Sequence, residues 1–444
     1  MAIITPSAKS HERVTGRWVH DYEIRTPQDW IVYYLKLIFG TPVPYLMWSY
    51  AIVTFLSRTG SEIAAWGCAL LTLVYIVADR FSSAREIKLF TIGGDLFLIG
   101  YAIVCLCSAF TSDSALESLA SLSGVRWVLL VYLMTYCWEL FPGLNRVFAL
   151  LLFAAGGVCL YGVWQHFTGM DLLRSAELPS APVPSSVFFV ANGFFTRPEI
   201  FATLMAMSAP FPIAAYLCAH RKAPRLQRYI PLALALLLLL GVFWTYRPGL
   251  WGAALSGVLV AAFMQPRRLL GVLIAIAAFF SAVVLLSYES PETLISSVQV
   301  SEEVRAEQQR SQINSQVQLW QENMWLGAGG KAQERANLDP GNGNVYFDIL
   351  AQSGILGLGF YLLFILGFLL SSYRGLKEIP SSHYWHRVLL IGSLASQVAF
   401  HMSGLYWSTF SEPTATNLFV LIVASTSYLI EHYERGLVSD DESL

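Results

Sequence analysis

Residues 231–263, PLALALLLLLGVFWTYRPGLWGAALSGVLVAAF, set the organisation of this chain, because two apolar runs in them flank a short turn at Arg247. A helix needs about 20 apolar residues to cross the hydrocarbon core of a bilayer, and each run comes close to that length. Pro248 and Gly249 follow the arginine directly, and proline suits the first position of a helix. The stretch therefore predicts two membrane-spanning helices joined by a tight turn.

The composition of the whole chain agrees with a membrane protein. Of its 444 residues, 55% are hydrophobic and only 13% are charged, whereas a soluble domain carries about 25% charged residues. The net charge of −2 provides no basic field, so we predict no nucleic-acid partner. The six cysteines show no pairing or metal-ligand spacing. The composition thus excludes a soluble enzyme, a disordered chain and a disulfide scaffold.

Similar apolar runs recur along the chain, and we predict an all-α, polytopic integral membrane protein with about twelve transmembrane helices in a lipid bilayer. The predicted spans are 41–57, 62–78, 91–110, 125–141, 147–168, 198–219, 229–246, 248–265, 269–288, 344–372, 388–409 and 413–432. The predicted regions are a cytoplasmic N-terminal segment with an interfacial helix (1–40), spans one to nine (41–288), a long periplasmic loop (289–343), spans ten to twelve (344–432) and a cytoplasmic tail (433–444).

Lysine and arginine are unevenly divided between the two sides of this arrangement. With both termini in the cytoplasm, nineteen of them lie in cytoplasmic segments and nine on the opposite side, which is the usual bias of short loops. We therefore predict a multi-pass membrane protein with both termini in the cytoplasm. Within the long outer loop, residues 301–321 predict polar helices, and long outer loops are usually functional.

Three arginines on the predicted outer side are candidates for chemistry. Arg197 lies at the mouth of the sixth span, Arg247 in the turn described above, and Arg310 in the long loop. A single arginine at a membrane surface is commonly only a snorkelling side chain. Three on one face favour an anionic ligand, because a guanidinium group matches two phosphate oxygens at once. A helix N-terminus after Arg247 adds to the attraction for phosphate.

Four stretches resemble, in order, motifs of the O-antigen ligase and polysaccharide polymerase superfamily. They surround the same long outer loop and together cover about 190–365, whereas the first half of the chain matches only in hydropathy. The four stretches are GFFTRPEIFATLMAMSAPFPIAAY (193–216), FWTYRPGLWGAALSGVLV (243–260), WQENMWLGAGG (320–330) and GNVYFDILAQSGILGLGFYLLFIL (343–366).

This resemblance implies a membrane glycosyltransferase whose donor and acceptor are undecaprenyl-pyrophosphate-linked oligosaccharides. It would polymerise repeat units into an exopolysaccharide or O-polysaccharide at the periplasmic face of the bacterial inner membrane, with inversion at the anomeric carbon and without a metal or other cofactor. The resemblance therefore implies an active site that faces the periplasm. A flippase and a chain-length regulator are the protein partners expected beside it. The sequence itself shows no Asp/His cluster with metal-ligand spacing.

The resemblance also assigns roles to residues. It makes Arg247 and Arg310 the catalytic pair that binds pyrophosphate, and Arg197 assists them. Asn344 and Tyr346, in the segment where the long loop re-enters the membrane, would bind and orient the sugar.

Two carboxylates in the same stretches complete the predicted substrate-binding set. Glu199 lies two residues after Arg197, as an ion-pair partner for that arginine or as a proton acceptor, and Asp348 shares a helix face with Asn344. In the ligases, the re-entry segment begins with a histidine taken to activate the acceptor hydroxyl, and the matching residue here is Gly343. The sequence therefore favours a polymerase over a ligase that transfers the glycan to another acceptor, and it leaves the general base open.

A secondary transporter is the alternative from a different class, because twelve spans suit one. VADRFSSAR at 77–85 faintly resembles a major-facilitator loop but lacks its glycines, and no internal repeat is visible. GAGGK at 327–331 resembles a phosphate-binding loop, yet Ala332 stands where that motif needs serine or threonine. We interpret it as a helix-breaking turn.

Overall fold

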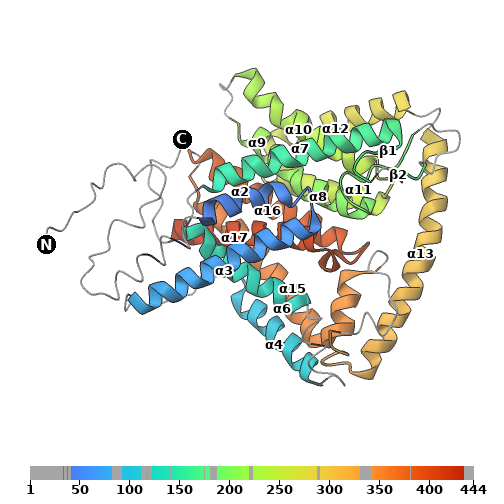
Figure 1. Ribbon diagram of the computed structural model, residues 1–444. Helices are drawn as coiled ribbons and strands as arrows, with labels where there is room; N and C mark the ends of the chain where they lie inside the picture. Colours follow the sequence, from blue (N-terminus) through green and yellow to red (C-terminus); the bar gives the residue numbers. More distant parts are fainter. Residues whose placement is uncertain are drawn as a thin grey trace.

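The computed structural model is a bundle of helices with one long helix along its side (Figure 1). The predicted N-terminal segment and cytoplasmic tail lie almost wholly outside the described residues. The structure describes residues 34, 38, 42–82, 93–111, 118, 123–140, 143–174, 176–180, 188–219, 224–287, 291–330, 343–380 and 382–434.

A helix covers each of the apolar runs predicted as spans, and the run 198–219 is divided into two helices at Pro210. The helices that cover the runs are α2 (Pro42–Val53), α3 (Arg58–Ser82), α4 (Asp95–Thr111), α6 (Ser123–Leu140), α7 (Leu144–Thr168), α8 (Pro198–Ser208), α9 (Pro210–Cys218), α10 (Arg225–Phe243), α11 (Pro248–Phe263), α12 (Pro266–Ser287), α15 (Val345–Glu378), α16 (Tyr384–Ser403) and α17 (Pro413–Glu434). Within the described residues, the structure also has the long helix α13 (Pro291–Glu322), the 3-10 turn η2 (Thr409–Ser411) and two short antiparallel strands, β1 (Met170–Asp171) and β2 (Ala176–Glu177).

Among the described segments, five are long and apolar enough to cross a membrane. They are Arg58–Val77 of α3, α7, the continuous α8–α9 segment, α15 and α17. Six further apolar stretches of the described residues are shorter, at 10–17 residues each. These findings agree with an all-α protein suited to a bilayer, whereas the number of crossings and the side that each loop faces stay predictions.

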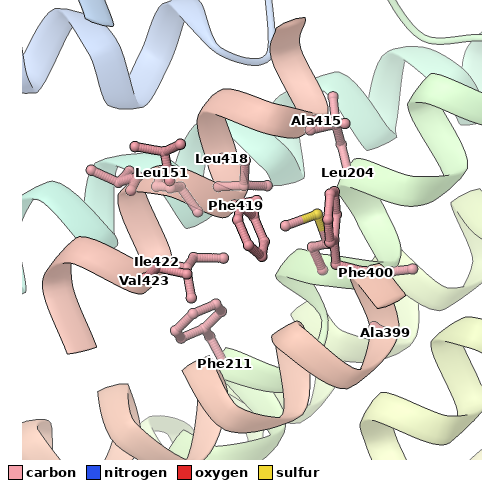
Figure 2. Close-up of a cluster of buried hydrophobic side chains, with 14 of the residues drawn as sticks. Leu151, Leu204, Phe211, Ala399, Phe400, Ala415, Leu418, Phe419, Ile422 and Val423 are labelled. Atoms are coloured by element: carbon pink, nitrogen blue, oxygen red, sulfur yellow. The ribbon is translucent and has the colours of Figure 1, made fainter. Parts of the chain in front are cut away.

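The α8–α9 segment and α17 lie at the centre of the bundle. Their most apolar stretches are 94% and 89% buried by other parts of the protein. Figure 2 shows side chains of these helices packed with Phe400 of α16, whose ring stacks on Phe419 of α17 at 4.6 Å between centroids. Within a bilayer such close packing, rather than the expulsion of water, holds helices together. The starts of α8 and α17 are therefore held in the middle of one end of the bundle.

Helix α15 is interrupted at Gly354, whose φ of 65° and ψ of −168° are not helical. The turn after α13 pairs with the backbone groups that this break frees. Ala328 N donates to Ala351 O at 2.8 Å, and Ile355 N donates to Met324 O at 3.0 Å. Such pairing is required wherever a helix ladder is broken away from water. Residues 327–330, the described part of the stretch that resembles a phosphate loop, thus belong to a turn that docks onto α15.

Candidate functional site

Two central helices begin with an Arg-Pro pair. Arg197 precedes α8 and Arg247 precedes α11, and each is followed by a proline at the first helical position. Among the described residues, Tyr246 is the one non-glycine residue with a positive φ, 54°, so the turn before Arg247 has an uncommon backbone conformation. Helix α8 packs against α11. The partial positive charge of two helix starts therefore adds to that of the two arginines.

Glu199 joins these two helices to the long helix α13. It is the second residue of α8 and is only 5% exposed. Its Oε1 lies 3.0 Å from Nε of Arg247 and also forms an ion pair with Arg305 of α13. Nη1 of Arg305 lies 3.8 Å from Oε1 of Glu302, one turn earlier on α13. Two segments far apart in the sequence thus place their positive charges on one buried carboxylate of a third.

The surroundings of Arg247 favour an anion. Burial lowers the pKa of this guanidinium, and the positive charge of Arg305 acts in the same direction, whereas Glu199 and Glu302 raise the pKa. Two guanidinium groups this close repel each other in a partly dry site, so a negative charge between them is stabilising. Glu199 supplies that charge in the structure.

A second glutamate, Glu412, lies directly before α17 and faces two further arginines. Its Oε1 is 3.9 Å from Nε of Arg58 at the start of α3. Burial raises the pKa of Glu412, and the charges of Arg58 and Arg197 oppose that rise. The charge of Arg197 therefore acts on Glu412. Glu199, two residues later in the chain, pairs instead with Arg247 and Arg305.

The loop after α16 ties α13 to the start of α15. The carbonyl of Leu405 accepts hydrogen bonds from Nδ2 of Asn344 at 2.9 Å and from Nε2 of Gln309 at 3.1 Å. Gln309 lies one helical turn after Arg305, so Asn344 lies close to the arginine cluster. Oδ1 of Asn344 also caps α15 by accepting from the backbone N–H of Tyr346 at 2.9 Å.

Asp348 lies one turn into α15 and is 6% exposed. It accepts hydrogen bonds from Oγ of Ser408 and from Nε2 of Gln316 on α13. A Cβ atom at Gly343 would lie 2.5 Å from Oγ of Ser408, so this serine fills the space where a side chain at position 343 would begin. The space beside Gly343 therefore holds a serine hydroxyl that is bonded to a carboxylate.

The structure therefore brings some predicted site residues together and leaves others apart. Arg247 and Glu199 are in contact, and Asn344 lies near them. The hydroxyl of Tyr346 donates to the carbonyl of His401 at 2.9 Å. Arg310 is exposed, and none of the acidic side chains in the described part of the chain pairs with it.

Arg305, which the sequence analysis did not select, occupies the place expected for Arg310. Five residues separate the two arginines, which is about 140° around a helix, so they point in different directions. A signal was present in the sequence, because Arg305 belongs to a row of polar residues spaced alternately by three and four that forms one stripe of α13. The row is Glu302, Arg305, Gln309, Gln312 and Gln316.

Comparison with known proteins identifies no family for this chain. No protein-family model matches this chain, and no curated protein matches it. Within the described residues, no group of three or more histidine, cysteine, aspartate or glutamate side chains is arranged to hold a metal ion. The arginines, carboxylates and amides described above are therefore the features from which a function can be inferred.

Proposed function

We propose that this protein is a membrane glycosyltransferase that polymerises undecaprenyl-pyrophosphate-linked oligosaccharide repeat units at the periplasmic face of a bacterial inner membrane. The observation that carries this proposal is the meeting of Arg247 and Arg305 on the buried Glu199, at the start of two helices. Two guanidinium groups that converge on one oxygen atom form a cradle of the kind that binds the oxygens of a diphosphate.

The reaction requires the protein mainly to position the two reactants and to stabilise the negative charge of the leaving diphosphate. The hydroxyl of the acceptor sugar attacks the anomeric carbon of the donor, and the bond from that carbon to the diphosphate oxygen breaks with its electron pair. Arg247 and Arg305 stabilise the negative charge that grows on the leaving diphosphate. Attack from the side opposite the leaving group inverts the anomeric carbon, and no metal or other cofactor is assigned a step.

The uncharged side chains near the arginines support a carbohydrate as the remainder of the ligand. Gln309 and Asn344 present amide groups close to Arg305, and amides form hydrogen bonds with hydroxyl groups as both donors and acceptors. The ring of Tyr406 is 40% exposed and lies against Gly249, where a Cβ atom would come within 2.2 Å of it. Its position beside the Arg247 turn suits a platform for a sugar ring.

The re-entry segment supports a polymerase rather than a ligase. Position 343 is a glycine, so this chain supplies no acceptor-activating imidazole where the ligases have one, and Oγ of Ser408 lies where a side chain at that position would begin. The expected acceptor is therefore the non-reducing end of a second lipid-linked repeat unit, and the expected product is a ladder of chain lengths.

Arg305 and Arg310 provide a matched test of this proposal. Arg305→Gln should lower polymer formation by a factor on the order of 10² or more, because one of two groups that stabilise the leaving diphosphate is lost. Arg310→Gln removes the same charge from the exposed face of α13 and should leave polymer formation within about twofold of wild type. Each variant is expressed in cells lacking their own copy, and the polymer ladder is compared at equal membrane levels of protein.

The reverse result, loss with Arg310→Gln and a normal ladder with Arg305→Gln, would move the diphosphate site away from Glu199. A normal ladder with both variants would contradict the site altogether.

A further inference from the structure

Four large apolar side chains lie together at the break in α15, and each is between 39% and 66% exposed. Met324 and Trp325 belong to the turn after α13, and Ile355 and Leu356 follow the break directly. Backbone hydrogen bonds hold the two pairs side by side. Met324 O accepts from Ile355 N at 3.0 Å, and Trp325 O accepts from the next residue of α15 at 3.4 Å. We call these four residues the break patch; exposed apolar patches mark surfaces that contact a partner or a membrane.

The break patch is continuous with the apolar surface of α15. The most apolar stretch of this helix has a hydropathy of 2.2, yet only 33% of it is buried inside the protein, so most of it is available to lipid. A helix of 34 residues is about 51 Å long, whereas the hydrocarbon core of a bilayer is about 30 Å thick. A tilt of about 20°, which is the average for membrane helices, does not remove this difference. Part of α15 therefore lies outside the hydrocarbon core.

Side chains near the end of α15 mark one surface of that core. Tyr373 is 41% exposed, and Nζ of Lys377 lies 4.4 Å from the centre of its ring. Tyrosine and lysine at a helix end are typical of a membrane surface. The helix rises about 27 Å from Ile355 to Tyr373, which is close to the thickness of the core. The opposite surface would then coincide with the break at Gly354, beside Trp325, and tryptophan is also enriched at such surfaces.

Helix α13 suits a position outside this boundary. It is not among the described segments that are long and apolar enough to cross a membrane, and polar side chains occupy most of its length. Figure 1 shows α13 running crosswise to α7 and α12. Residues 345–353, the part of α15 before the break, contact α13 through the hydrogen bond between Asp348 and Gln316. The polar helix and this part of α15 thus lie together on one side of the break patch.

We propose that the break patch is embedded in the lipid leaflet on the side of the arginine cluster, among acyl chains close to the headgroups, and that Trp325 anchors the end of α13 there. This is the outer leaflet in the predicted orientation. Helix α13 then lies along the membrane surface while Arg305 contacts the bundle. Asn344 and Asp348 lie beyond the hydrocarbon core, and the tenth span begins near residue 354 rather than at 344. This placement does not depend on the reaction that the protein catalyses.

Tryptophan fluorescence of the full-length protein in lipid nanodiscs tests this placement. The signal of Trp325 is the difference between wild type and Trp325→Phe, a variant that keeps the patch apolar. Lipids with brominated acyl chains should quench this signal by about twofold or more relative to ordinary lipids, and iodide in the water should quench it little. Trp407→Phe provides the control subtraction, because Trp407 is 2% exposed and neither quencher should reach it.

The position of the bromine atoms along the acyl chain tests the depth. Bromines near the headgroup should quench Trp325 more strongly than bromines near the methyl end, since tryptophans of this kind lie at headgroup level. Stronger quenching from the methyl end would overturn the boundary at Gly354.

Two other occupants of the break patch give different results. Quenching by iodide but not by brominated lipid would place Trp325 in water, where it could stack on a sugar ring, and would overturn the proposal. A Trp325 signal that neither quencher reaches would indicate a protein contact, such as a second copy of the chain, and would overturn it as well. Because no arm of this experiment measures polymer formation, the placement and the proposed function can fail separately.

Discussion

Replacing Arg247 by glutamine is expected to reduce glycan transfer by a factor on the order of 10³ or more. The loss is larger than that expected at Arg305 because Arg247 precedes the first residue of α11, where a guanidinium group and a helix start act on the same anion. Glutamine keeps much of the length and polarity of the side chain. The lost activity therefore reflects the missing charge and the missing pair of parallel hydrogen bonds.

The measurement is the polymer ladder in cells that depend on the introduced gene, normalised to the protein present in the membrane. Arg247→Lys should recover only part of the activity, because a point charge does not replace the planar fork. Arg126→Gln is the matched control, since the side chain of Arg126 is 45% exposed and its pair with Glu62 lies at the surface. Full-length polymer from Arg247→Gln would rule out this arginine as a ligand of the diphosphate.

Replacing Gly354 by alanine is expected to destabilise the folded protein by on the order of 4 kcal/mol. Its φ of 65° with ψ of −168° belongs to a region that only glycine adopts readily. A Cβ atom there would also lie 2.2 Å from the carbonyl oxygen of Trp325. The docked turn after α13 would have to move away and lose hydrogen bonds to α15.

Thermal unfolding in detergent measures this effect, and Gly359→Ala serves as its control. Gly359 lies in the same helix and has no atom within 4 Å of a Cβ added there. Alanine at that position should leave stability unchanged or raise it by about 0.5–1 kcal/mol, the usual gain over glycine inside a helix. Equal melting temperatures for the Gly354 and Gly359 variants would show that α15 does not need its break.

Much of the helical architecture could be predicted from local composition. Each apolar run bounded by polar residues forms a helix, because an apolar segment satisfies its own backbone hydrogen bonds only in that way within a bilayer. The break in α15 could not be predicted in the same way. It depends on backbone groups of a distant turn, and the sequence GILGLG around Gly354 is equally suited to close packing of an unbroken helix.

The candidate site was predicted in part. Arg247 and Glu199 lie beside helix-starting prolines, and this local pattern was sufficient to select them. The choice between Arg305 and Arg310 depends on which face of α13 turns toward the bundle, and a motif carries no information about rotation. The alternating spacing of Arg305, Gln309 and Gln316 did contain that information, because residues at such spacing share one side of a helix.

That spacing has a consequence for the length of α13. Arg305 contacts Glu199, and Gln316, eleven residues later on the same helix, contacts Asp348. Both contacts require that the two side chains point to the same side of α13. One residue inserted between them would turn one end by about 100° relative to the other, whereas seven inserted residues would nearly restore the phase and lengthen the helix by about 10 Å. Homologous chains should therefore tolerate many substitutions on the outward side of this helix but very few single-residue insertions or deletions within it.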